Sequence, residues 1–450
     1  MKMKTIVAVL TVLAVAALIW GCKTASHKIQ HHPEWSCNSV VYEMNIRQST
    51  PEGTFAAAEK RLPALRDLGV DIVWLMPIHP IGVEGRKGSL GSYYAIADYY
   101  AINPEFGTMA DFDRFLATAH SLGLRVILDY VANHTSPDAA WVTEKPADWY
   151  VRDSLGRTIV QYDWTDIAKL NYKNPELRDE MKRVLHFWVD KGVDGFRCDA
   201  AKEMPDKFWR EAFAELRAKN PELYLLAEGE GANFHRDGFD ATYAWELHHL
   251  MNDVAQGKAT AADIRKYVDK DGRAVPAGAF RLMFTSNHDE NSWAGTEFER
   301  MGDAAAVMAM LTYTLPDSQP LIYTGQEVGF NRRLAFFDKD SIDDWTPNAC
   351  TDLYRRLNTL KHGNRALAAG VNGGKGAMLE NDMPDRVLSF ARECDGNTVI
   401  VVANLSPEPV NVGIDLGGRE GEYTDFATGG KCTADKDFKL DKWTCKIMTR

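Results

Sequence analysis

An arginine and an aspartate stand two residues apart in the segment Gly195–Ala201 (GFRCDAA), where a short apolar run ends. Side chains alternate across a strand, so Arg197 and Asp199 are expected to point to the same side. A guanidinium beside a carboxylate favours the ionised acid and lowers its pKa, which suits a carboxylate nucleophile at neutral pH. An isolated pair of this kind is more often a structural ion pair. The interpretation therefore depends on what the rest of the chain places beside it.

Three further apolar runs also end in polar side chains. They are Asp129, Asn133 and His134 in DYVANHTS, Glu228 in LLAEGE, and Asn287, His288 and Asp289 in FTSNHDE. Each residue alone has a structural explanation, as an ion pair, a cap or a solvated loop. Acids at the ends of neighbouring strands converge on one mouth if the strands are parallel and form a barrel.

Three converging acids supply the chemistry that cleaves a glycosidic bond. One carboxylate must be ionised to attack the anomeric carbon, and a second must be protonated to donate to the leaving oxygen. Asp199 beside Arg197 suits the first role. Glu228 suits the second, because the apolar residues 225–227 before it are expected to raise its pKa. Asp289 would stabilise the positive charge of the transition state.

The elements that must position these acids form an alternating pattern from residue 35 to about residue 363. Eight short apolar runs alternate with helical segments, and the expected fold is a closed parallel (β/α)8 TIM barrel. The expected strands are 40–47, 70–78, 124–132, 193–200, 223–228, 239–244, 280–287 and 320–323, and the expected helices include 55–68, 110–122, 174–191 and 205–219. A doubly wound open sheet is the alternative, but no G-x-G-x-x-G or P-loop pattern supports it.

Two segments interrupt or follow the barrel, which is expected at 35–134 and 173–363. The insertion 135–172 is too long for an ordinary βα loop and indicates a small lobe over the barrel mouth. After residue 364 short β-type runs alternate with Gly-, Asp- and Asn-containing turns, which predicts a C-terminal antiparallel β domain at 364–450.

The chain resembles the α-amylase family of retaining glycoside hydrolases, glycoside hydrolase family 13. DYVANH, GFRCDAA, LLAEGE and FTSNHD match the four signature regions of that family in order, and VDIVWLMPI, IAKLN and YTGQEVG extend the match. The resemblance implies Asp199 as nucleophile, Glu228 as general acid/base and Asp289 as transition-state stabiliser.

The resemblance also implies substrate-binding and supporting residues. Arg197, His134 and His288 would contact the sugar that is attacked, Tyr94 would stack under it, and Lys202 would lie on the leaving-group side. The supporting residues would be Asp98, Asp129 and Asn133. The tryptophans in and around these regions, namely Trp141, Trp149, Trp245 and Trp293, are interpreted as packing residues rather than as sugar platforms.

The chain departs from the family at a calcium site. Many members bind calcium through an asparagine matching Asn133, an aspartate in the lobe and a backbone carbonyl of a histidine after the fourth strand. Here the last two positions are Lys169 and Glu203. An ammonium group cannot bind calcium and can neutralise nearby acids itself, so calcium is not expected at this site. No cofactor is required for the expected reaction, and calcium at another site stays open. Lys169 in a K-L-N context is similar to the neopullulanase and cyclomaltodextrinase group.

The N-terminus and the composition concern location and partners. Residues 1–22 have the charged and apolar regions of a signal peptide, and IWGC resembles a bacterial lipobox with an unusual Trp. Cleavage before Cys22 and a lipid anchor on its thiol are expected; an ordinary cleaved signal or an uncleaved anchor are the alternatives. A net charge of −11 argues against nucleic acid as a partner. Among the six later cysteines, Cys432 and Cys445 are the pair expected to form a disulfide if any does.

The leading hypothesis is an exported, lipid-anchored enzyme at the cell envelope that cleaves α-1,4-glucosidic bonds in α-glucans or malto-oligosaccharides. A neopullulanase, cyclomaltodextrinase, α-glucosidase or transglycosylase on the same scaffold is the first alternative. A non-catalytic glucan-binding lipoprotein is the remote one, because such a relative is expected to have lost at least one of the three acids.

Overall fold

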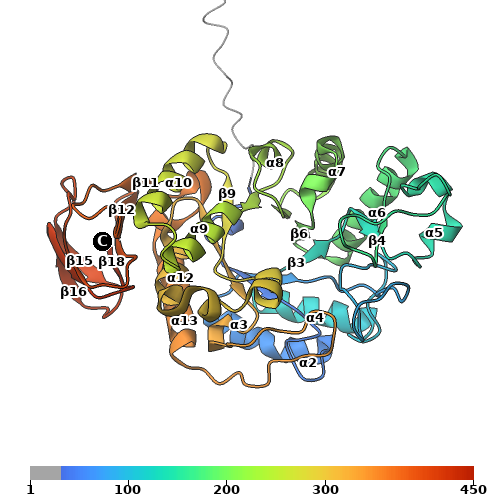
Figure 1. The fold of residues 1–450 in the computed structure, drawn as a ribbon, viewed down its shortest axis with the longest axis horizontal. Helices are drawn as coiled ribbons and strands as arrows, with labels where there is room; N and C mark the ends of the chain where they lie inside the picture. Colours follow the sequence, from blue (N-terminus) through green and yellow to red (C-terminus); the bar gives the residue numbers. More distant parts are fainter. Residues whose placement is uncertain (1–31) are drawn as a thin grey trace, which may run out of the picture.

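A computed structural model describes residues 32–450 of the chain. The predicted signal peptide and Cys22 lie outside this range. Eight parallel strands close into a barrel in the order β1-β10-β9-β8-β7-β6-β3-β2, which confirms the predicted TIM barrel (Figure 1). They are β1 Val41–Met44, β2 Ile72–Leu75, β3 Arg125–Tyr130, β6 Gly195–Cys198, β7 Tyr224–Ala227, β8 Ala241–Tyr243, β9 Phe280–Met283 and β10 Ser318–Tyr323.

Most strand residues are apolar because both faces of the strands are buried. In β2, Ile72 and Trp74 belong to the cluster inside the barrel, whereas Val73 and Leu75 belong to the layer between strands and helices. Alternation of side chains along a strand divides the core in this way. At the start of β6, a Cβ on Gly195 would lie 1.9 Å from the carbonyl oxygen of Tyr224, so only glycine fits.

Helices surround the barrel. They are α2 Phe55–Ala58, α3 Leu62–Leu68, α4 Met109–Ser121, α6 Pro175–Lys191, α7 Asp206–Lys219, α8 Ala232–Arg236, α9 Trp245–Ala255, α10 Ala261–Ala274, α11 Glu297–Met301, α12 Ala305–Thr314 and α13 Ala349–Gly363. Caps define several of their ends: Thr108 forms a capping box with Asp111 at the start of α4. The single helix predicted over 55–68 is wrong, because a 3-10 turn at Glu59–Arg61 separates α2 from α3 and Pro63 starts the second helix.

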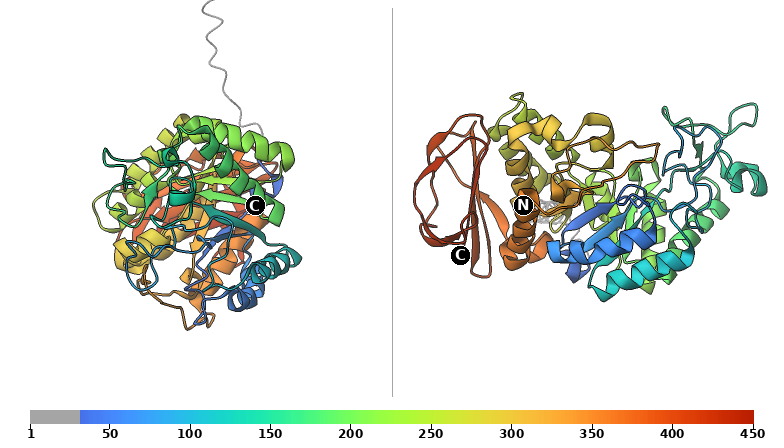
Figure 2. Two further views of the ribbon diagram at one scale, coloured as in Figure 1. Left: turned by 90° about the vertical axis from the view of Figure 1, so that its right-hand side faces the viewer. Right: turned by 90° about the horizontal axis from the view of Figure 1, so that it is seen from below.

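The inserted lobe lies between β3 and α6. It contains the two-stranded pair of β4 His134–Thr135 and β5 Ala168–Lys169, together with the short helix α5 Trp141–Glu144. The lobe and the C-terminal sheet lie at opposite ends of the molecule (Figures 1 and 2). The inserted chain therefore covers one side of the barrel and stays clear of the C-terminal domain.

The C-terminal domain is antiparallel, as predicted. Its six-stranded sheet has the order β11-β12-β13-β18-β15-β16, with β14 and β17 as a separate pair. The strands are β11 Lys375–Met378, β12 Val387–Cys394, β13 Asn397–Asn404, β14 Val410–Gly413, β15 Gly421–Asp425, β16 Lys431–Ala434, β17 Asp437–Leu440 and β18 Cys445–Thr449. Residues of β13 alternate between the barrel-side core, with Val399 and Val401, and the domain's own core, with Ile400 and Val402.

The expected disulfide between Cys432 and Cys445 is not formed, and the six cysteines at positions 37–445 are free. Cys432 lies in β16 and Cys445 in β18, with β15 between them in the sheet. Two strand spacings are about 10 Å, which exceeds the Cα separation that a disulfide spans.

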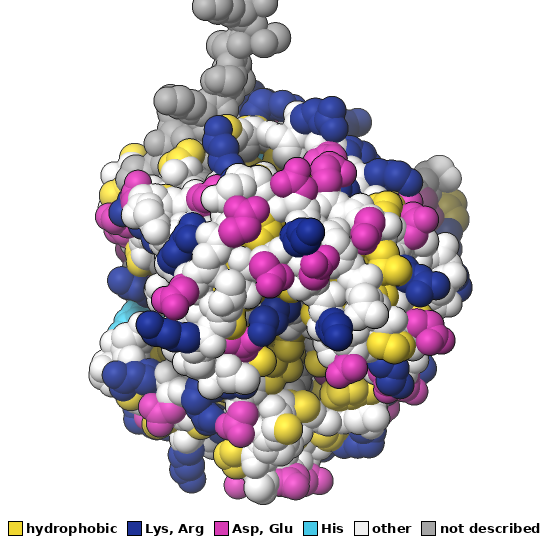
Figure 3. Space-filling view, turned by 90° about the vertical axis from the view of Figure 1, so that its left-hand side faces the viewer, with side chains coloured by type: hydrophobic (Ala, Val, Ile, Leu, Met, Phe, Trp, Pro, Cys, Tyr) yellow, Lys and Arg dark blue, Asp and Glu magenta, His cyan; other side chains and the backbone are white. Residues whose placement is uncertain are grey.

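The outward face of the C-terminal domain carries Lys, Arg, Asp and Glu side chains interspersed with one another (Figure 3). Within residues 32–450, no helix combines the length and apolar character that a membrane crossing needs.

Candidate active site

The predicted acids meet in one cavity of about 850 Å³ at the C-terminal ends of the barrel strands. Asp199 follows β6, Glu228 follows β7, and Asp289 lies in the segment after β9; all three line the cavity. Tyr94, His134, Lys202 and His288 line it as well. The structure thus brings together residues from five segments that are distant in the sequence.

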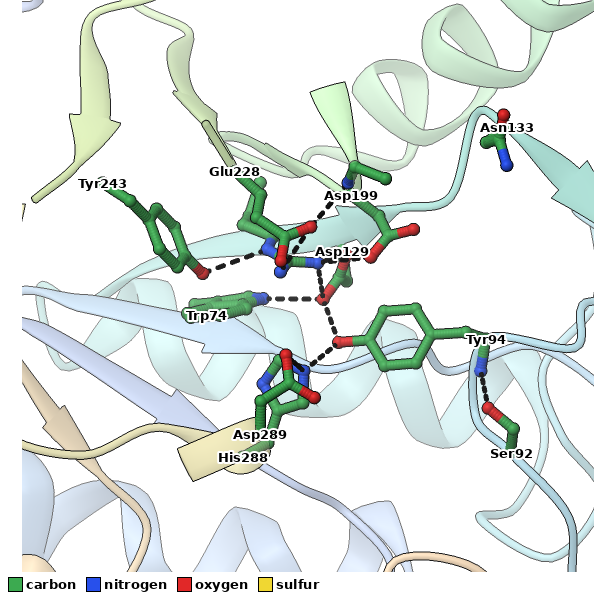
Figure 4. Close-up of polar contacts among 12 residues, drawn as sticks. Trp74, Ser92, Tyr94, Asp129, Asn133, Asp199, Glu228, Tyr243, His288 and Asp289 are labelled. Carbon is green, nitrogen blue, oxygen red and sulfur yellow. Dashed lines mark hydrogen bonds and ion pairs between the residues drawn. The ribbon is translucent and has the colours of Figure 1, made fainter. Parts of the chain in front are cut away.

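Arg197 is the centre of the polar network, and its four partners Asp129, Asp199, Glu228 and Tyr243 are labelled in Figure 4. Its buried guanidinium donates from Nη1 to Asp129 at 2.9 Å and to Asp199 at 3.0 Å, and Nη2 lies 3.2 Å from Oε2 of Glu228. Its Nε donates to the hydroxyl of Tyr243 at 3.2 Å. One cation therefore holds three carboxylates, two of which are the predicted nucleophile and acid/base.

The pKa values of Asp199 and Glu228 are shifted in directions opposite to those predicted from the sequence. Burial and the charge of Glu228 raise the pKa of Asp199 well above its usual range, although Arg197 opposes them. Burial also acts to raise the pKa of Glu228, but Arg197 and the N–H of Ala200, at 2.6 Å, lower it overall. The two-residue spacing of Arg197 and Asp199 does not reveal that Arg197 also faces Glu228. The charge of each carboxyl group affects the pKa of the other, so Asp199 and Glu228 titrate as a pair.

The backbone next to Asp199 is strained. Ala200 has a φ of 43°, in the left-handed region that residues with a Cβ rarely adopt. This conformation directs its N–H at Glu228. Backbone strain of this kind is concentrated at functional sites.

Asp129 and Tyr94 form the floor beside Arg197. Oδ2 of Asp129 accepts the hydroxyl of Tyr94 at 3.0 Å and the indole N–H of Trp74 at 3.3 Å. Burial raises the pKa of Asp129 to about 6, against the charge of Arg197. Through these contacts Asp129 holds both Arg197 and the ring of Tyr94 in position.

His288 lies between two acids. Its Nδ1 is 2.5 Å from Oε1 of Glu43, and its Nε2 is 3.4 Å from Asp289 and 2.9 Å from the hydroxyl of Tyr94. Burial lowers the pKa of His288, but the charges of Asp289 and Glu43 outweigh it and raise the pKa to about 9. At neutral pH the imidazole is therefore a cation.

The remaining predicted residues are placed as follows. Burial lowers the pKa of His134 to about 4, so it is a neutral ring, and it contacts the carbonyl of Tyr94 at 3.1 Å. Lys202 is exposed at the rim of the cavity. Asp98 does not join the site: it is exposed, lies outside the cavity lining and accepts the N–H of Tyr100. The spacing of Tyr94 and Asp98 therefore did not indicate a shared site.

The residues at the family's calcium position do not fit calcium. The amide of Asn133 donates to Oε1 of Gln161 at 2.8 Å, and the amide of Gln161 donates to Glu203 at 2.6 Å. Lys169 pairs with His134 across β4 and β5. One buried oxygen, Oδ1 of Asn133, has no hydrogen-bond partner. Calcium takes six to eight oxygen ligands, and within residues 32–450 no three His, Cys, Asp or Glu residues are grouped to hold a metal.

The four tryptophans differ from one another. Trp149 is buried, and Trp141 packs beside it with ring centroids 5.4 Å apart, as predicted for packing residues. Trp245 and Trp293 line the cavity, and Trp293 is 56% exposed. The prediction that Trp293 is a buried packing residue is therefore wrong, because its indole faces the cavity. The indole lies beside the phenyl rings of Phe336 and Phe337.

The sequence interpretation missed Glu43 and Tyr162. Glu43 is fully buried in β1, and a lone acid within an apolar strand, VVYEMNIR, was a signal that could have indicated it. Tyr162 lines the cavity from the inserted lobe, and no spacing in the sequence indicated its position.

Comparison with known proteins agrees with this geometry. The family model of the alpha-amylase catalytic domain matches residues 41–154 and 145–357. The chain is 30% identical over 435 residues to alpha-amylase MalA of Haloarcula japonica, covering 93% of this chain and 63% of that protein. It is 40% identical over 397 residues to an alpha-1,4-glucan:maltose-1-phosphate maltosyltransferase of Arcanobacterium haemolyticum, covering 79% of this chain and 55% of that protein.

The fold is similar to that of a solved structure as well. The noncanonic maltogenic alpha-amylase AmyB of Thermotoga neapolitana superposes with a TM-score of 0.83 at 28% identity, covering 92% of this chain and 98% of that one. A parallel barrel with three acids around a buried arginine defines the class, and the chain belongs to the alpha-amylase family. It spans less than two thirds of the length of these two curated relatives.

Proposed function

We propose that the protein hydrolyses α-1,4-glucosidic bonds in starch-type glucans or malto-oligosaccharides, with retention at the anomeric carbon. The observation that carries this proposal is the placement of Asp199, Glu228 and Asp289 in one cavity, with Arg197 contacting the first two. Two acids of this kind supply the nucleophile and the acid/base of a double displacement.

In the first step an oxygen of Asp199 attacks the anomeric carbon while Glu228 gives its proton to the departing glycosidic oxygen. In the second step Glu228 takes a proton from water, the water oxygen attacks the same carbon, and Asp199 is released. Asp289, 39% exposed at its side chain, faces the developing positive charge. His288 lines the cavity and donates a hydrogen bond to a sugar hydroxyl, whereas the fully buried Arg197 acts through the acids that it holds.

The shared proton of the pair has to lie on Glu228 when the leaving group departs. Because the two carboxyl groups titrate as a pair, a change in charge at one of them moves the proton to the other. The positive charge that develops at the anomeric carbon during the reaction favours the ionised form of Asp199, so the proton is then on Glu228.

A glycosyl transferase on the same scaffold is the second candidate. It is favoured by the similarity to a maltosyltransferase, and by the lining of the cavity beyond Glu228 with Lys202, Glu230 and Tyr162, which could hold an acceptor sugar. In that case a sugar hydroxyl replaces water in the second step. A neopullulanase, a cyclomaltodextrinase or an α-glucosidase would use the same two steps and differ only in the glucan chain that fits its cavity.

The test is a product profile by chromatography on starch, pullulan, cyclodextrin and maltotriose. Release of shorter malto-oligosaccharides with retained α configuration supports the proposal, and longer products from maltotriose support transfer. Asp199→Asn should abolish either reaction without unfolding the protein, since the side chains have the same size. Retained activity of this variant on starch would overturn the assignment.

We also propose that the enzyme is exported and anchored through a lipid on Cys22, on the basis of the N-terminal sequence. Metabolic labelling with a radioactive fatty acid tests it. The label is expected on the wild-type chain and absent from Cys22→Ala; an unlabelled wild-type chain in the soluble fraction would contradict it.

A further inference from the structure

One loop of the inserted lobe, residues 161–164, reaches over the cavity and is tied to the barrel through Glu203. Both oxygens of this carboxylate are used: Oε2 accepts the amide of Gln161 at 2.6 Å, and Oε1 accepts the hydroxyl of Tyr162 at 2.6 Å. Gln161 in turn accepts from Asn133, at the end of β3, at 2.8 Å. Glu203 thus connects the lobe to two ends of barrel strands.

Glu203 lies in the short 3-10 turn Ala201–Glu203, four residues after Asp199. Hydrogen bonds to a carboxylate are stronger than bonds between neutral groups. The position is the one at which the chain departs from the family's calcium pattern. At this position the carboxylate of Glu203 and the amide of Gln161 connect the barrel to the inserted lobe.

Tyr162 is an exposed aromatic residue in a strained backbone. Its φ is 52°, in the left-handed region, and its side chain remains 63% exposed although it lines the cavity. Its ring packs edge-on against Trp164, with ring centroids 5.0 Å apart. A left-handed backbone conformation costs free energy, so the surrounding contacts must hold it. An exposed aromatic ring held in this way is typical of a ligand-binding position.

Tyr162 lines the same cavity as Glu228 and is joined to the segment after β6 through Glu203. Its partner Glu203 belongs to the turn that begins at Ala200, whose N–H binds Glu228. Tyr94, His288 and Asp289 lie across from Glu228 in the site (Figure 4). The sugar that departs with the proton of Glu228 therefore faces Tyr162.

We propose that Glu203 is a positioning residue that holds the ring of Tyr162 as a stacking platform for the sugar on the leaving-group side. This inference rests on the proposed glycosidase function and names a specificity determinant of that site. The flat face of a glucose unit carries C–H groups that pack on an aromatic ring, while its hydroxyls stay at the edge. Lys87 binds the carbonyl of Asp163 at 3.3 Å from the other flank, so a change at Glu203 releases Tyr162 without detaching the loop.

The experiment compares maltotriose with α-maltosyl fluoride, which has no sugar in its leaving group. In Tyr162→Ala, kcat/KM for maltotriose is expected to fall about tenfold, whereas kcat/KM for the fluoride stays within about twofold. Tyr162→Phe, which keeps the ring and loses the bond to Glu203, is expected to lie between wild type and Tyr162→Ala on maltotriose. Glu203→Gln is expected to behave like Tyr162→Phe.

A double mutant separates positioning from a general structural role. Adding Glu203→Gln to Tyr162→Ala is expected to cost nothing further, because Glu203 acts through the ring that is already absent. Leu155→Ala is the matched control, since Leu155 is exposed in the same lobe and outside the cavity lining; both substrates should be unaffected.

Equal losses on both substrates, or additive losses in the double mutant, would overturn this inference and leave the proposed function intact. Unchanged kcat/KM for maltotriose in Tyr162→Ala would overturn it as well. Failure of the proposed function is recognised separately, because the wild-type enzyme would then cleave neither substrate.

Discussion

Oε1 of Glu43 lies 2.5 Å from Nδ1 of His288, and the two side chains form a buried ion pair between β1 and the segment after β9. The other oxygen of Glu43 is buried without a hydrogen-bond partner. His288 is therefore the group that offsets this buried charge, and Glu43 and Asp289 together keep the imidazole protonated at neutral pH. The cation then faces Tyr94 and the cavity.

This ion pair predicts a loss of stability at alkaline pH. The pKa of His288 is about 9 in the folded protein, against 6.5 ordinarily. The contribution is thus fully present below pH 6.5 and is lost as pH rises through 9, by about 3 kcal/mol in total. Urea unfolding of the wild type and of Glu43→Gln between pH 6 and 10 measures it as a difference, because Lys361 contributes in the opposite direction at alkaline pH. In Glu43→Gln the decline should begin at lower pH, whereas Glu144→Gln, an exposed acid in the lobe, should follow the wild type. Identical profiles for Glu43→Gln and wild type would contradict the coupling.

The barrel could be predicted from the sequence because its strands are short apolar runs whose burial needs no other information. The run 70–78, for example, contains β2, and the polar residues that follow such runs mark the mouth. Seven of the eight strands were predicted longer than they are in the structure, whereas β10 was predicted at 320–323 and spans Ser318–Tyr323. The acids Asp199, Glu228 and Asp289 were predictable for the same reason, since each follows an apolar run.

Relationships between distant segments were not predictable. The distribution of the proton between Asp199 and Glu228 depends on Nη2 of Arg197, which contacts Glu228. These two residues are 31 positions apart in the sequence. The sequence shows Glu203 only as a departure from the family's calcium pattern. Its contacts with Gln161 and Tyr162 form because the inserted lobe folds back over the barrel. Spacing in the sequence carries no information about which distant partner a charged group meets.

The roles of the two central acids can be separated with α-maltosyl fluoride. Fluoride leaves without a proton, so Glu228→Gln should release a first burst of fluoride, one per enzyme, at close to the wild-type rate. Later turnovers should be slow because Glu228 also activates water in the second step, and cleavage of maltotriose should fall about 10³-fold. Asp199→Asn should lose about 10⁴-fold on both substrates, because the nucleophile is needed in each case. Fluoride release is followed with an ion electrode. Glu222→Gln, an exposed acid before β7, is the control; loss of fluoride release in Glu228→Gln would reverse the assigned roles.

Because the oxygen donors around Asn133 do not fit calcium, we expect chelators to leave the stability of the protein unchanged. A bound cation that recognised only the folded protein would raise its melting temperature, and removing the cation would lower it. EDTA treatment is therefore expected to leave the Tm within about 1 °C of the untreated protein. Differential scanning calorimetry with EDTA, and again after adding calcium, checks this. A fall of several degrees that calcium restores would show that a site exists.

The amide of Gln161 is expected to contribute stability at that position. Gln161→Ala leaves the side chains of Asn133 and Glu203 each without one partner, and buried or half-buried polar groups without partners cost about 1–3 kcal/mol. Urea unfolding at pH 7 measures the change. Thr143→Ala in the same lobe is the matched control, since its hydroxyl is exposed and bonds only within its own turn. Equal stability of Gln161→Ala and wild type would remove Gln161 as the connecting residue.

Lys361 predicts an opposite pH dependence at the other end of the molecule. Its amino group is fully buried and donates to the carbonyls of Ser318 at 2.9 Å and Leu367 at 2.8 Å. Burial and the charge of Arg392 lower its pKa from 10.5 to about 7. The unfolded chain therefore binds more protons than the folded protein between pH 7 and 10.5, so this group's contribution to stability rises with pH.

The variant Lys361→Met isolates this effect from that of His288. The difference in unfolding free energy between wild type and Lys361→Met should shift in favour of the wild type by about 2–3 kcal/mol from pH 7 to pH 9, because only the wild type releases its proton on folding. Lys266→Met, exposed on α10, should show a constant difference over the same range. A pH-independent difference for Lys361→Met would mean that the buried amine keeps its proton in the folded protein.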